Sequence, residues 1–153
     1  MPIAYCGGTF DLLHPGHVRM LRWAQETFGR TVVAVNTDEF VTRYKAKPAQ
    51  TLHERMEMLE SCRYVDEVTV NWGDENSRIS ILSTDATHVV NGSDWTRERL
   101  MKQMNLDEEF LRQHGLDIAL CPLERIFSTT ELKERIRRGH GGDTTLHVGG
   151  EVS

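Results

Sequence analysis

The chain has 153 residues, of which 39% are hydrophobic and 27% are charged, so it can form one buried core but is too short for two ordinary domains. Its formal net charge of −5 gives no overall attraction to nucleic acid or to an anionic membrane, and neither is expected as a partner. An anionic ligand would therefore need a local basic site.

The cysteine count and the hydropathy pattern narrow the class of protein further. Cys6, Cys62 and Cys121 form no CxxC pair, and an odd number of cysteines without a secretory h-region argues against a disulfide scaffold. No apolar run approaches the roughly 20 residues that a membrane helix needs. We therefore expect a cytoplasmic protein.

Five short runs of apolar and β-branched residues are typical of buried strands: residues 3–6, 31–35, 67–70, 87–90 and 117–120. Helical patterns lie between them, most clearly over residues 17–28, where Gly29 occupies the position of a left-handed C-terminal cap. This alternation predicts an α/β fold, a single Rossmann-like domain with a five-stranded, mostly parallel sheet and helices on both faces. Ligands of such sheets bind at the carboxyl ends of the strands.

Two capping boxes, at residues 51–54 and 128–131, predict the starts of two further helices, the first of which ends near Arg63. After residue 138 the composition becomes rich in glycine and no apolar periodicity remains. The sequence therefore predicts one folded domain over residues 1–138 and a disordered Gly-rich tail over residues 139–153.

The first predicted strand runs into residues 7–17, with the sequence GGTFDLLHPGH. Glycines after a first strand let the backbone approach a ligand closely, and Pro15 suits the first turn of a helix. His14 and His17 are three residues apart at that helix start, so both imidazoles can face the same way beside backbone N–H groups. The pattern predicts a phosphate site with two titratable donors.

The same segment is compatible with fewer other functions. Neither G-x-G-x-x-G nor G-x-x-x-x-G-K-[ST] occurs, which disfavours a hydride-transfer enzyme and a P-loop kinase. A metal site at His14 and His17 lacks an obvious third ligand, and Pro15-Gly16 would disturb helical ligand spacing, so we predict no metal ligands in the chain itself. The remaining alternative is that both histidines only cap the helix.

These residues resemble the HxGH nucleotidyltransferases, specifically their cytidylyltransferase branch. The resemblance rests on Gly8-Thr9-Phe10-Asp11, His14-Pro15-Gly16-His17 and Ser128-Thr129-Thr130. Residues 36–40, 54–68 and 91–95 are also similar to stretches of bacterial glycerol-3-phosphate cytidylyltransferases, so the resemblance extends over about residues 3–136.

The resemblance implies an enzyme that transfers CMP from CTP to a small phosphorylated alcohol, first of all sn-glycerol 3-phosphate, and releases pyrophosphate. Mg²⁺ would be bound with the triphosphate, and a homodimer is common in the family. His14 and His17 would donate to the α-phosphate during displacement. The alternatives are an adenylyltransferase that uses ATP on a phosphorylated cofactor or sugar precursor, and a catalytically weak nucleotide-binding or regulatory module.

Further basic residues could hold phosphate. Lys45 and Lys47 lie in a loop before Pro48, where their ammonium groups can reach a triphosphate or an incoming phosphate, or else form a solvated charge pair. Both lysines are assigned, with Thr129 and the two histidines, to the catalytic set. The resemblance places Arg55, which lies in an R-x-x-x-L motif, near the acceptor phosphate. The alternative is that Arg55 is an ordinary surface arginine.

The last predicted helix carries the third phosphate-binding element. Ser128, Thr129 and Thr130 offer hydroxyls and N-terminal amides to the β- and γ-phosphates. Family members commonly have an arginine five residues before that serine, where this chain has Leu123. Arg125 is the candidate replacement. Without it, triphosphate affinity or the choice of acceptor is expected to differ from the family's, because leucine does not replace a guanidinium.

Base recognition is assigned to residues after the fourth strand. Asp94 and neighbouring carbonyls can accept from the amine of cytosine, and Trp95 offers a ring face to base or ribose; the alternative is a turn aspartate and a packed tryptophan. This pair, read through the resemblance, favours cytidine over adenosine. Asp11 could orient the ribose, neighbouring backbone or hydrated Mg²⁺. The nucleotide-binding set is completed by Gly8, Thr9, Phe10, Gly16 and Gly92.

Two other tryptophans have no assigned role in the site. Trp23 and Trp72 are expected to be packing residues.

Overall fold

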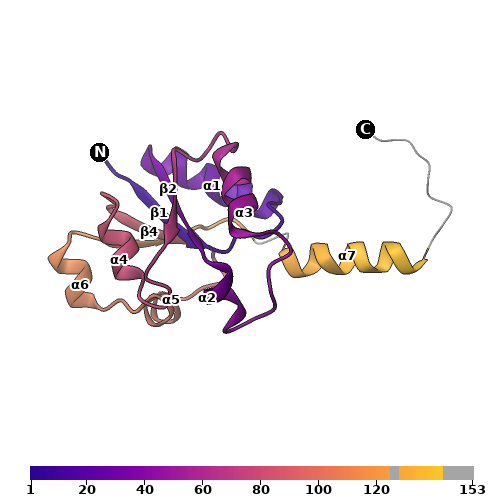
Figure 1. The fold of residues 1–153 in the computed structure, drawn as a ribbon. Coiled ribbons are helices and arrows are strands. Elements are labelled where there is room, and N and C mark those ends of the chain that lie inside the picture. Colours follow the sequence, from indigo (N-terminus) through magenta and orange to yellow (C-terminus); the bar gives the residue numbers. More distant parts are fainter. Residues whose placement is uncertain (125–127, 143–153) are drawn as a thin grey trace.

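A parallel five-stranded sheet forms the centre of the computed structural model, which describes residues 1–124 and 128–142 (Figure 1). The strand order is β3-β2-β1-β4-β5, and each neighbouring pair is parallel. The predicted sheet is confirmed, and it is wholly rather than mostly parallel. The strands are β1 (Ala4–Gly8), β2 (Thr31–Asn36), β3 (Glu67–Asn71), β4 (His88–Asn91) and β5 (Asp117–Leu120).

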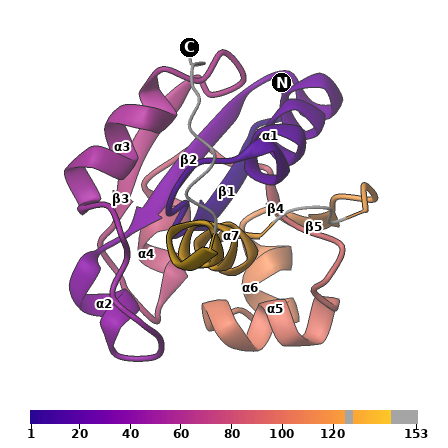
Figure 2. The same cartoon turned by 90° about the vertical axis from the view of Figure 1, so that its right-hand side faces the viewer.

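Helices cover both faces of the sheet, as the alternating pattern predicts (Figure 2). α1 and α3 pack on one face, and α4, α5 and α6 pack on the other. Successive side chains of β1 point to opposite faces, so Ala4 and Cys6 join the first buried cluster and Tyr5 joins the second. The helices are α1 (Pro15–Phe28), α2 (Asp38–Thr42), α3 (Leu52–Glu60), α4 (Ser77–Leu82), α5 (Arg97–Met104), α6 (Glu108–Gln113) and α7 (Thr129–Gly142).

Local sequence signals set the ends of α1. Pro15 is its first residue, where the missing N–H of proline costs no helical hydrogen bond. Gly29 follows its last residue with a φ of 94°, in the left-handed region that glycine adopts without a steric penalty. The helix therefore begins two residues before the predicted range and ends where the pattern predicts.

The predicted capping box of α3 is present. The Thr51 hydroxyl accepts from the N–H of Glu54 at 3.2 Å, and the Glu54 carboxylate accepts from the N–H of Thr51 at 2.9 Å. The helix ends at Glu60 rather than near Arg63. The next amides form hydrogen bonds to carbonyls three residues back, which tightens the chain into a turn.

α7 begins at Thr129, as predicted, and projects away from the rest of the molecule (Figure 1). It continues to Gly142, so residues 139–142, which were predicted to belong to the tail, are helical. Each residue added to an existing helix gains a hydrogen bond without a new nucleation cost, so glycines can extend its last turn. The rest of the predicted tail, residues 143–153, lies outside the described residues.

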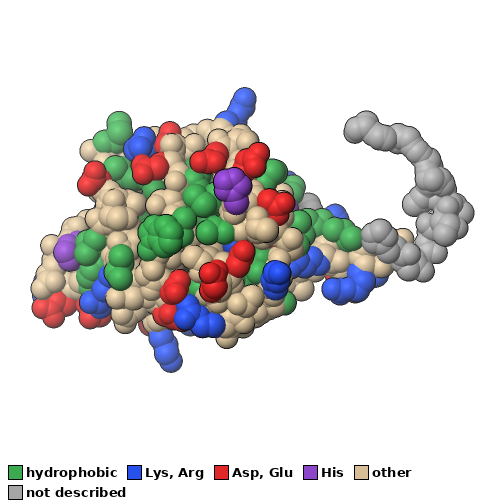
Figure 3. Space-filling model, in the orientation of Figure 1, with side chains coloured by type: hydrophobic (Ala, Val, Ile, Leu, Met, Phe, Trp, Pro, Cys, Tyr) green, Lys and Arg blue, Asp and Glu red, His purple; other side chains and the backbone are tan. Residues whose placement is uncertain are grey.

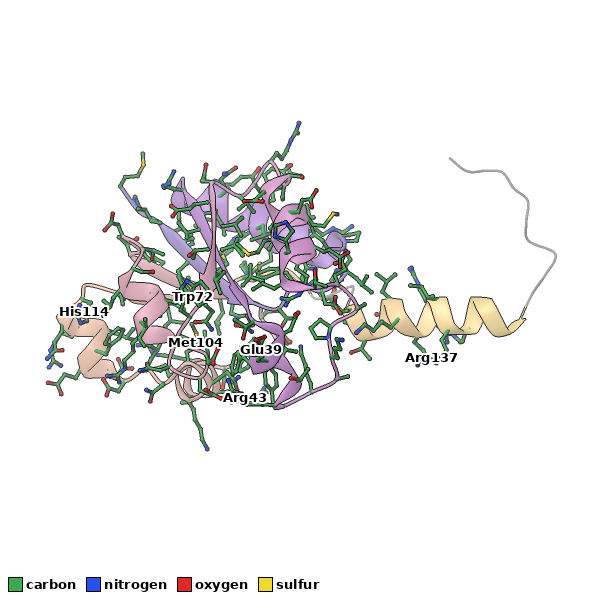
Figure 4. The ribbon with its side chains drawn as sticks, in the orientation of Figure 1. Glu39, Arg43, Trp72, Met104, His114 and Arg137 are labelled. Atoms are coloured by element: carbon green, nitrogen blue, oxygen red, sulfur yellow. The ribbon has the colours of Figure 1, made fainter. Side chains whose placement is uncertain are left out.

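The two tryptophans expected to pack have different environments. The Trp23 ring meets Phe28 edge to face, with centroids 5.8 Å apart, and packs against the buried cluster under α1. Trp72 follows the last residue of the edge strand β3 and is 73% exposed, so its predicted packing role is wrong. Figure 4 labels Trp72 among the drawn side chains.

The surface of the molecule carries charged side chains of both signs. Acidic and basic side chains are interspersed over the face shown in Figure 3. Within the described parts of the chain, no helix combines the length and the apolar character needed to cross a membrane.

Candidate active site

A cavity of about 400 Å³ opens at the carboxyl ends of β1 and β4, between the start of α1 and the start of α7. This is the edge where a parallel sheet exposes its strand ends and helix N-termini to a ligand. The cavity brings together most of the predicted site residues: Gly8, Thr9, Phe10, Asp11, His14, Gly16, His17, Lys45, Gly92, Asp94, Trp95, Thr129 and Thr130.

Some predicted residues are placed elsewhere. Lys47, Arg55 and Ser128 are not among the residues that line this cavity. Arg125, the predicted replacement for the family arginine, lies outside the described residues. Two cationic residues that the sequence analysis did not single out, Arg19 and Lys133, do line the cavity.

His14 and His17 stand at the start of α1 with stacked rings, 3.8 Å between centroids and 22° between planes. His14 caps the helix: its Nδ1 accepts from the N–H of Gly16 at 3.1 Å, and the Nδ1 of His17 accepts from the N–H of His14 at 3.3 Å. Because both Nδ1 atoms are acceptors, each neutral ring carries its hydrogen on Nε2. Both rings line the cavity, so the pair can supply two N–H donors to an anion there.

The loop before the histidines follows an unusual backbone path. Phe10 and Leu12 have φ values of 54° and 51°, a left-handed region that costs a non-glycine residue free energy. Contacts hold the loop in place: the Phe10 ring is buried 5.3 Å from the His17 ring, and the N–H of Leu12 donates to Oε1 of Gln50 at 2.9 Å. A Cβ on Gly8 would lie 3.1 Å from a Phe10 ring carbon, so a side chain there would require the ring to shift by a few tenths of an ångström.

Asp11 joins this loop to two other segments. Its buried carboxylate accepts from the N–H groups of Ala49 at 2.8 Å and Gln50 at 3.0 Å, and its Oδ2 lies 3.0 Å from Nζ of Lys133. Burial by itself raises the pKa of Asp11, but the two amide hydrogen bonds and Lys133 outweigh it and hold the pKa below its ordinary value of 3.8. Of the three roles left open for Asp11, the structure supports the orientation of neighbouring backbone.

The start of α7 docks on the same loop. The Thr129 hydroxyl donates to the backbone carbonyl of Asp11 at 2.8 Å, and the Ser128 hydroxyl caps the helix by accepting from the N–H of Glu131 at 3.0 Å. Lys133 lies one turn after Thr129, so its side chain reaches the same wall of the cavity. Helical spacing from Thr129 was the sequence signal that could have identified Lys133.

Lys45 and Lys47 differ in position although they are two residues apart. Both lie in the predicted loop before Pro48, which follows the short helix α2. Lys45 lines the cavity and its Nζ lies 5.6 Å from the centre of the Tyr44 ring. Lys47 is exposed and does not line the cavity, so the predicted reach of Lys47 to a bound phosphate has no support in this geometry.

Arg55 is neither a surface residue nor a cavity residue. Its side chain is 0% exposed and forms an ion pair with Asp38 at 2.6 Å. Its remaining donors bind the carbonyls of Thr9, Asn36 and Gln50 at 2.8, 2.9 and 3.2 Å. Arg55 therefore ties the β1–α1 loop to the end of β2 and to α2, and these contacts give it a structural role away from the cavity lining.

Residues 91–95, at the end of β4 and just after it, form another wall of the cavity. The N–H of Trp95 donates to the carbonyl of Gly92 at 3.2 Å, which closes a turn. A Cβ on Gly92 would lie 2.8 Å from Oδ1 of Asp94, so the absence of a side chain lets the carboxylate take its position. The Arg99 guanidinium lies 5.1 Å from the Trp95 ring centre. Asp94 is exposed at the cavity, and Trp95 also packs against the core.

Leu123, which stands where family members carry an arginine, lines the cavity and is 45% exposed. Its backbone carbonyl accepts from the Ser93 hydroxyl at 3.1 Å, which connects the segment after β5 to the turn after β4. Cationic side chains at the cavity come instead from Arg19, Lys45 and Lys133.

The described side chains at the cavity do not form a metal site of their own. Within residues 1–124 and 128–142, no group of three or more His, Cys, Asp or Glu side chains could hold a metal ion. The carboxylate of Asp11 is already engaged by two amides and an ammonium group. These residues suit a cation that keeps water and phosphate oxygens as its ligands, as Mg²⁺ commonly does.

Comparison with known proteins gives the family. The cytidylyltransferase-like family model matches residues 5–140. The chain is 33% identical over 129 residues to the glycerol-3-phosphate cytidylyltransferase of Bacillus subtilis, a match that covers 84% of this chain and 92% of that protein. It is also 34% identical over 139 residues to the bifunctional protein HldE of Rhodopseudomonas palustris, with 90% of this chain covered, but it spans only 27% of that relative's length.

Solved structures support the fold assignment. The lipopolysaccharide core biosynthesis protein of Thermoplasma volcanium superposes with a TM-score of 0.65 at 17% identity, covering 81% of this chain and 99% of that one. Thermotoga maritima TmcAL, crystallised with alpha-thio ATP, superposes with a TM-score of 0.61 at 13% identity, covering 92% of this chain and 51% of that one. The fold follows from the structures and the family from the sequence matches, and this protein belongs to the cytidylyltransferase-like family of nucleotidyltransferases.

Proposed function

We propose that the protein transfers CMP from CTP to a small phosphorylated alcohol and releases pyrophosphate. The observation that carries this proposal is one cavity in which His14 and His17, at one helix start, lie with Thr129 and Thr130, at another. A triphosphate needs several positive or hydrogen-donating groups around adjacent phosphates, and this arrangement offers them at a strand edge.

The chemistry demands positioning more than acid–base catalysis. A phosphate monoester has a second pKa of about 6, so the acceptor is already a nucleophile near neutral pH. Its oxygen would attack the α-phosphorus, the bond to the bridging oxygen of the β-phosphate would break, and pyrophosphate would leave. The Nε2–H groups of His14 and His17 would donate to α-phosphate oxygens as negative charge develops in the transition state.

The cationic side chains at the rim would hold the rest of the triphosphate. Lys133 is anchored by Asp11, and Lys45 lines the cavity from the segment after α2. Thr130 adds its hydroxyl, and Thr129 and Thr130 add helix N-terminal amides, whereas the Thr129 hydroxyl already donates to the carbonyl of Asp11. Mg²⁺ bound to the triphosphate would neutralise part of its charge, with phosphate and water oxygens as the principal ligands.

Cytosine would bind at the wall formed by Gly92, Asp94 and Trp95. A carboxylate can accept from the exocyclic amine of cytosine, and the partly buried indole offers a ring face to the base. The rival substrate, ATP, also carries an exocyclic amine but has a larger ring system. The sequence match to a glycerol-3-phosphate cytidylyltransferase along almost its whole length supports CTP and makes sn-glycerol 3-phosphate the first acceptor to test.

The test is a pyrophosphate-release panel in which CTP and ATP are each combined with glycerol 3-phosphate, phosphocholine, phosphoethanolamine and phosphopantetheine. We expect release that depends on both CTP and one phosphorylated alcohol. Faster release from ATP would overturn the choice of base but keep the mechanism. No release from either nucleotide, in protein that binds CTP, would favour a nucleotide-binding module instead.

A further inference from the structure

A second recess lies beside the nucleotide cavity, between α2, the loop after β3 and α5. Its volume is about 860 Å³, and its aromatic walls come from Phe40, Tyr44 and Trp95. Trp95 lines both the recess and the nucleotide cavity, and α2 separates them, with Val41 and Lys45 on the cavity side. A molecule bound in the cavity could therefore extend beside Trp95, next to the position proposed for the cytosine, into the recess.

The side chains that line the recess are unusually cationic for an acidic protein. Three of them are cations, Arg43, Arg99 and Lys102, against one carboxylate, Glu75. Arg43 is neutralised, since it lies 2.7 Å from Asp74 and 3.5 Å from Glu75. Figure 3 shows basic side chains together with acidic ones along the lower edge of the molecule, in the region where Figure 1 draws α5 and α2.

The other two cations have no carboxylate partner in the parts of the chain that the structure describes. Arg99 is held by the Trp95 ring at 5.1 Å and by a long hydrogen bond of 3.5 Å to the carbonyl of Asp94. An aromatic ring positions a guanidinium group without cancelling its charge, whereas a carboxylate would cancel it. Lys102 lies one turn further along α5, on the same wall.

We infer that this recess binds a second anionic group of the acceptor, at the end opposite the phosphate that reacts. This inference rests on the proposed function and narrows its acceptor class: phosphorylated alcohols that end in a carboxylate or a second phosphate bind more tightly than those that end in a hydroxyl. Arg99 and Lys102 are the residues that discriminate, because their charge meets the distal anion.

The experiment uses acceptors in matched pairs that differ by one carboxylate in place of one hydroxymethyl group. Glycerol 3-phosphate is compared with 3-phosphoglycerate, and sorbitol 6-phosphate with 6-phosphogluconate, so that two chain lengths test how far the recess lies from the reacting phosphate. Equilibrium binding by calorimetry is measured beside turnover. We expect the anionic member of at least one pair to bind about five- to tenfold more tightly than its neutral counterpart. This difference in affinity should become smaller at high salt.

Three variants separate the recess from the rest of the site. Arg99→Ala and Lys102→Ala, both at exposed positions, should each reduce the preference for the anionic acceptor while the Kd for CTP changes little in Lys102→Ala. Arg97→Ala is the matched control, because Arg97 lies on the same helix, pairs with Glu108 at 2.9 Å and lines neither cavity. Equal affinities within both pairs, or a preference that survives both recess variants, would overturn the inference.

The calorimetric binding measurements also distinguish a failure of the proposed function from a failure of the inference about the recess. If no nucleotide releases pyrophosphate, the proposed function fails, yet calorimetry still reports whether the carboxylate-bearing probe binds and whether Arg99 and Lys102 are responsible. If pyrophosphate is released but the paired acceptors bind equally well, the proposed function stands and the recess has no part in acceptor choice.

Discussion

The ammonium group of Lys133 lies 3.0 Å from the carboxylate of Asp11, and this ion pair anchors the last helix to the loop after the first strand. The same carboxylate holds two backbone amides of the segment before α3. One buried aspartate thus fixes the relative positions of two walls of the cavity. Its substitution should affect both the stability of the fold and the alignment of the site.

Asp11→Asn should lower the stability of the protein by about 2 kcal/mol at pH 7, because an amide cannot satisfy both backbone donors and the ammonium group. The lowered pKa of Asp11 means that its contribution is present above the ordinary value of 3.8 and is lost as the pH falls through the folded-state value. Thermal unfolding at pH 7 and pH 3 should show a difference between variant and wild type that shrinks in acid.

A control for this prediction is Asp66→Asn. Asp66 accepts from the N–H of Thr31 at 2.8 Å but is exposed and distant from the cavity. The Asp66→Asn substitution should lower the free energy of unfolding without reducing turnover, whereas Asp11→Asn should reduce both. A destabilisation by Asp11→Asn that is the same at both pH values would contradict the assigned role of the charge.

His14→Asn separates the two roles of this histidine. Asparagine is a favourable N-cap, so its side-chain oxygen can still accept from the N–H of Gly16, but it has no donor at the position of Nε2. We expect a melting temperature close to that of the wild type and a kcat lower by roughly 10²- to 10³-fold. Steady-state kinetics of His14→Asn and of a His114→Asn control, a position outside both cavities, would check this. Unchanged turnover in folded His14→Asn would leave only the capping role.

Lys45→Met and Lys47→Met form a matched pair. Only Lys45 lines the cavity, so only its neutralisation should raise the KM for CTP, by about three- to tenfold, and weaken the salt dependence of binding. The measurement is KM at several ionic strengths for each variant. If the two variants behave alike, the cavity wall at Lys45 has been assigned wrongly.

Arg55→Met should act on stability rather than on substrate binding. It removes the partner of Asp38 and leaves the carbonyls of Thr9 and Asn36 without their donor, a loss of about 3 kcal/mol. Urea unfolding gives the free energy, and Arg22→Ala, at an exposed residue on α1, should change it little. A stable Arg55→Met protein with a raised KM for the acceptor would restore the phosphate-binding role.

Gly92→Ala should alter the choice of base. The added Cβ would lie 2.8 Å from Oδ1 of Asp94 and displace the carboxylate from its position at the cavity. We expect both Gly92→Ala and Asp94→Ala to reduce the ratio of kcat/KM for CTP over ATP, because a misplaced acceptor no longer pairs with the base. If the ratio is unchanged in both, Asp94 is a turn residue only.

The sheet was predictable because its strands depend on local composition. Apolar, β-branched runs such as residues 31–35 are buried on both faces, and a parallel order follows from the helices between them. Helix ends with a local signal, such as Gly29 or the Thr51 capping box, were also predictable. The exposure of Trp72 was not predictable, because it depends on which strand lies at the edge of the sheet.

The site was predictable where a motif fixes local geometry and not where a side chain's direction depends on the tertiary structure. The spacing of His14 and His17 brought both rings to one helix start. Arg55 lies within a motif too, but whether it turns outward to a phosphate or inward to Asp38 depends on the positions of β2 and α2. Helical spacing places Lys133 on the same face of α7 as Thr129, but its ion pair with Asp11 depends on how α7 docks, which local sequence does not determine.

The hydrogen bond between the Thr129 hydroxyl and the carbonyl of Asp11 joins residues 118 positions apart. Every strand of the sheet precedes α7 in the chain, so the core can form during synthesis before the helix that completes the cavity emerges. A nascent or truncated chain that stops after residue 124 would then hold a folded sheet with an open, incomplete cavity. Maturation of the site would be a separate, final event of folding, measurable as a delay between the recovery of native secondary structure and the recovery of nucleotide binding.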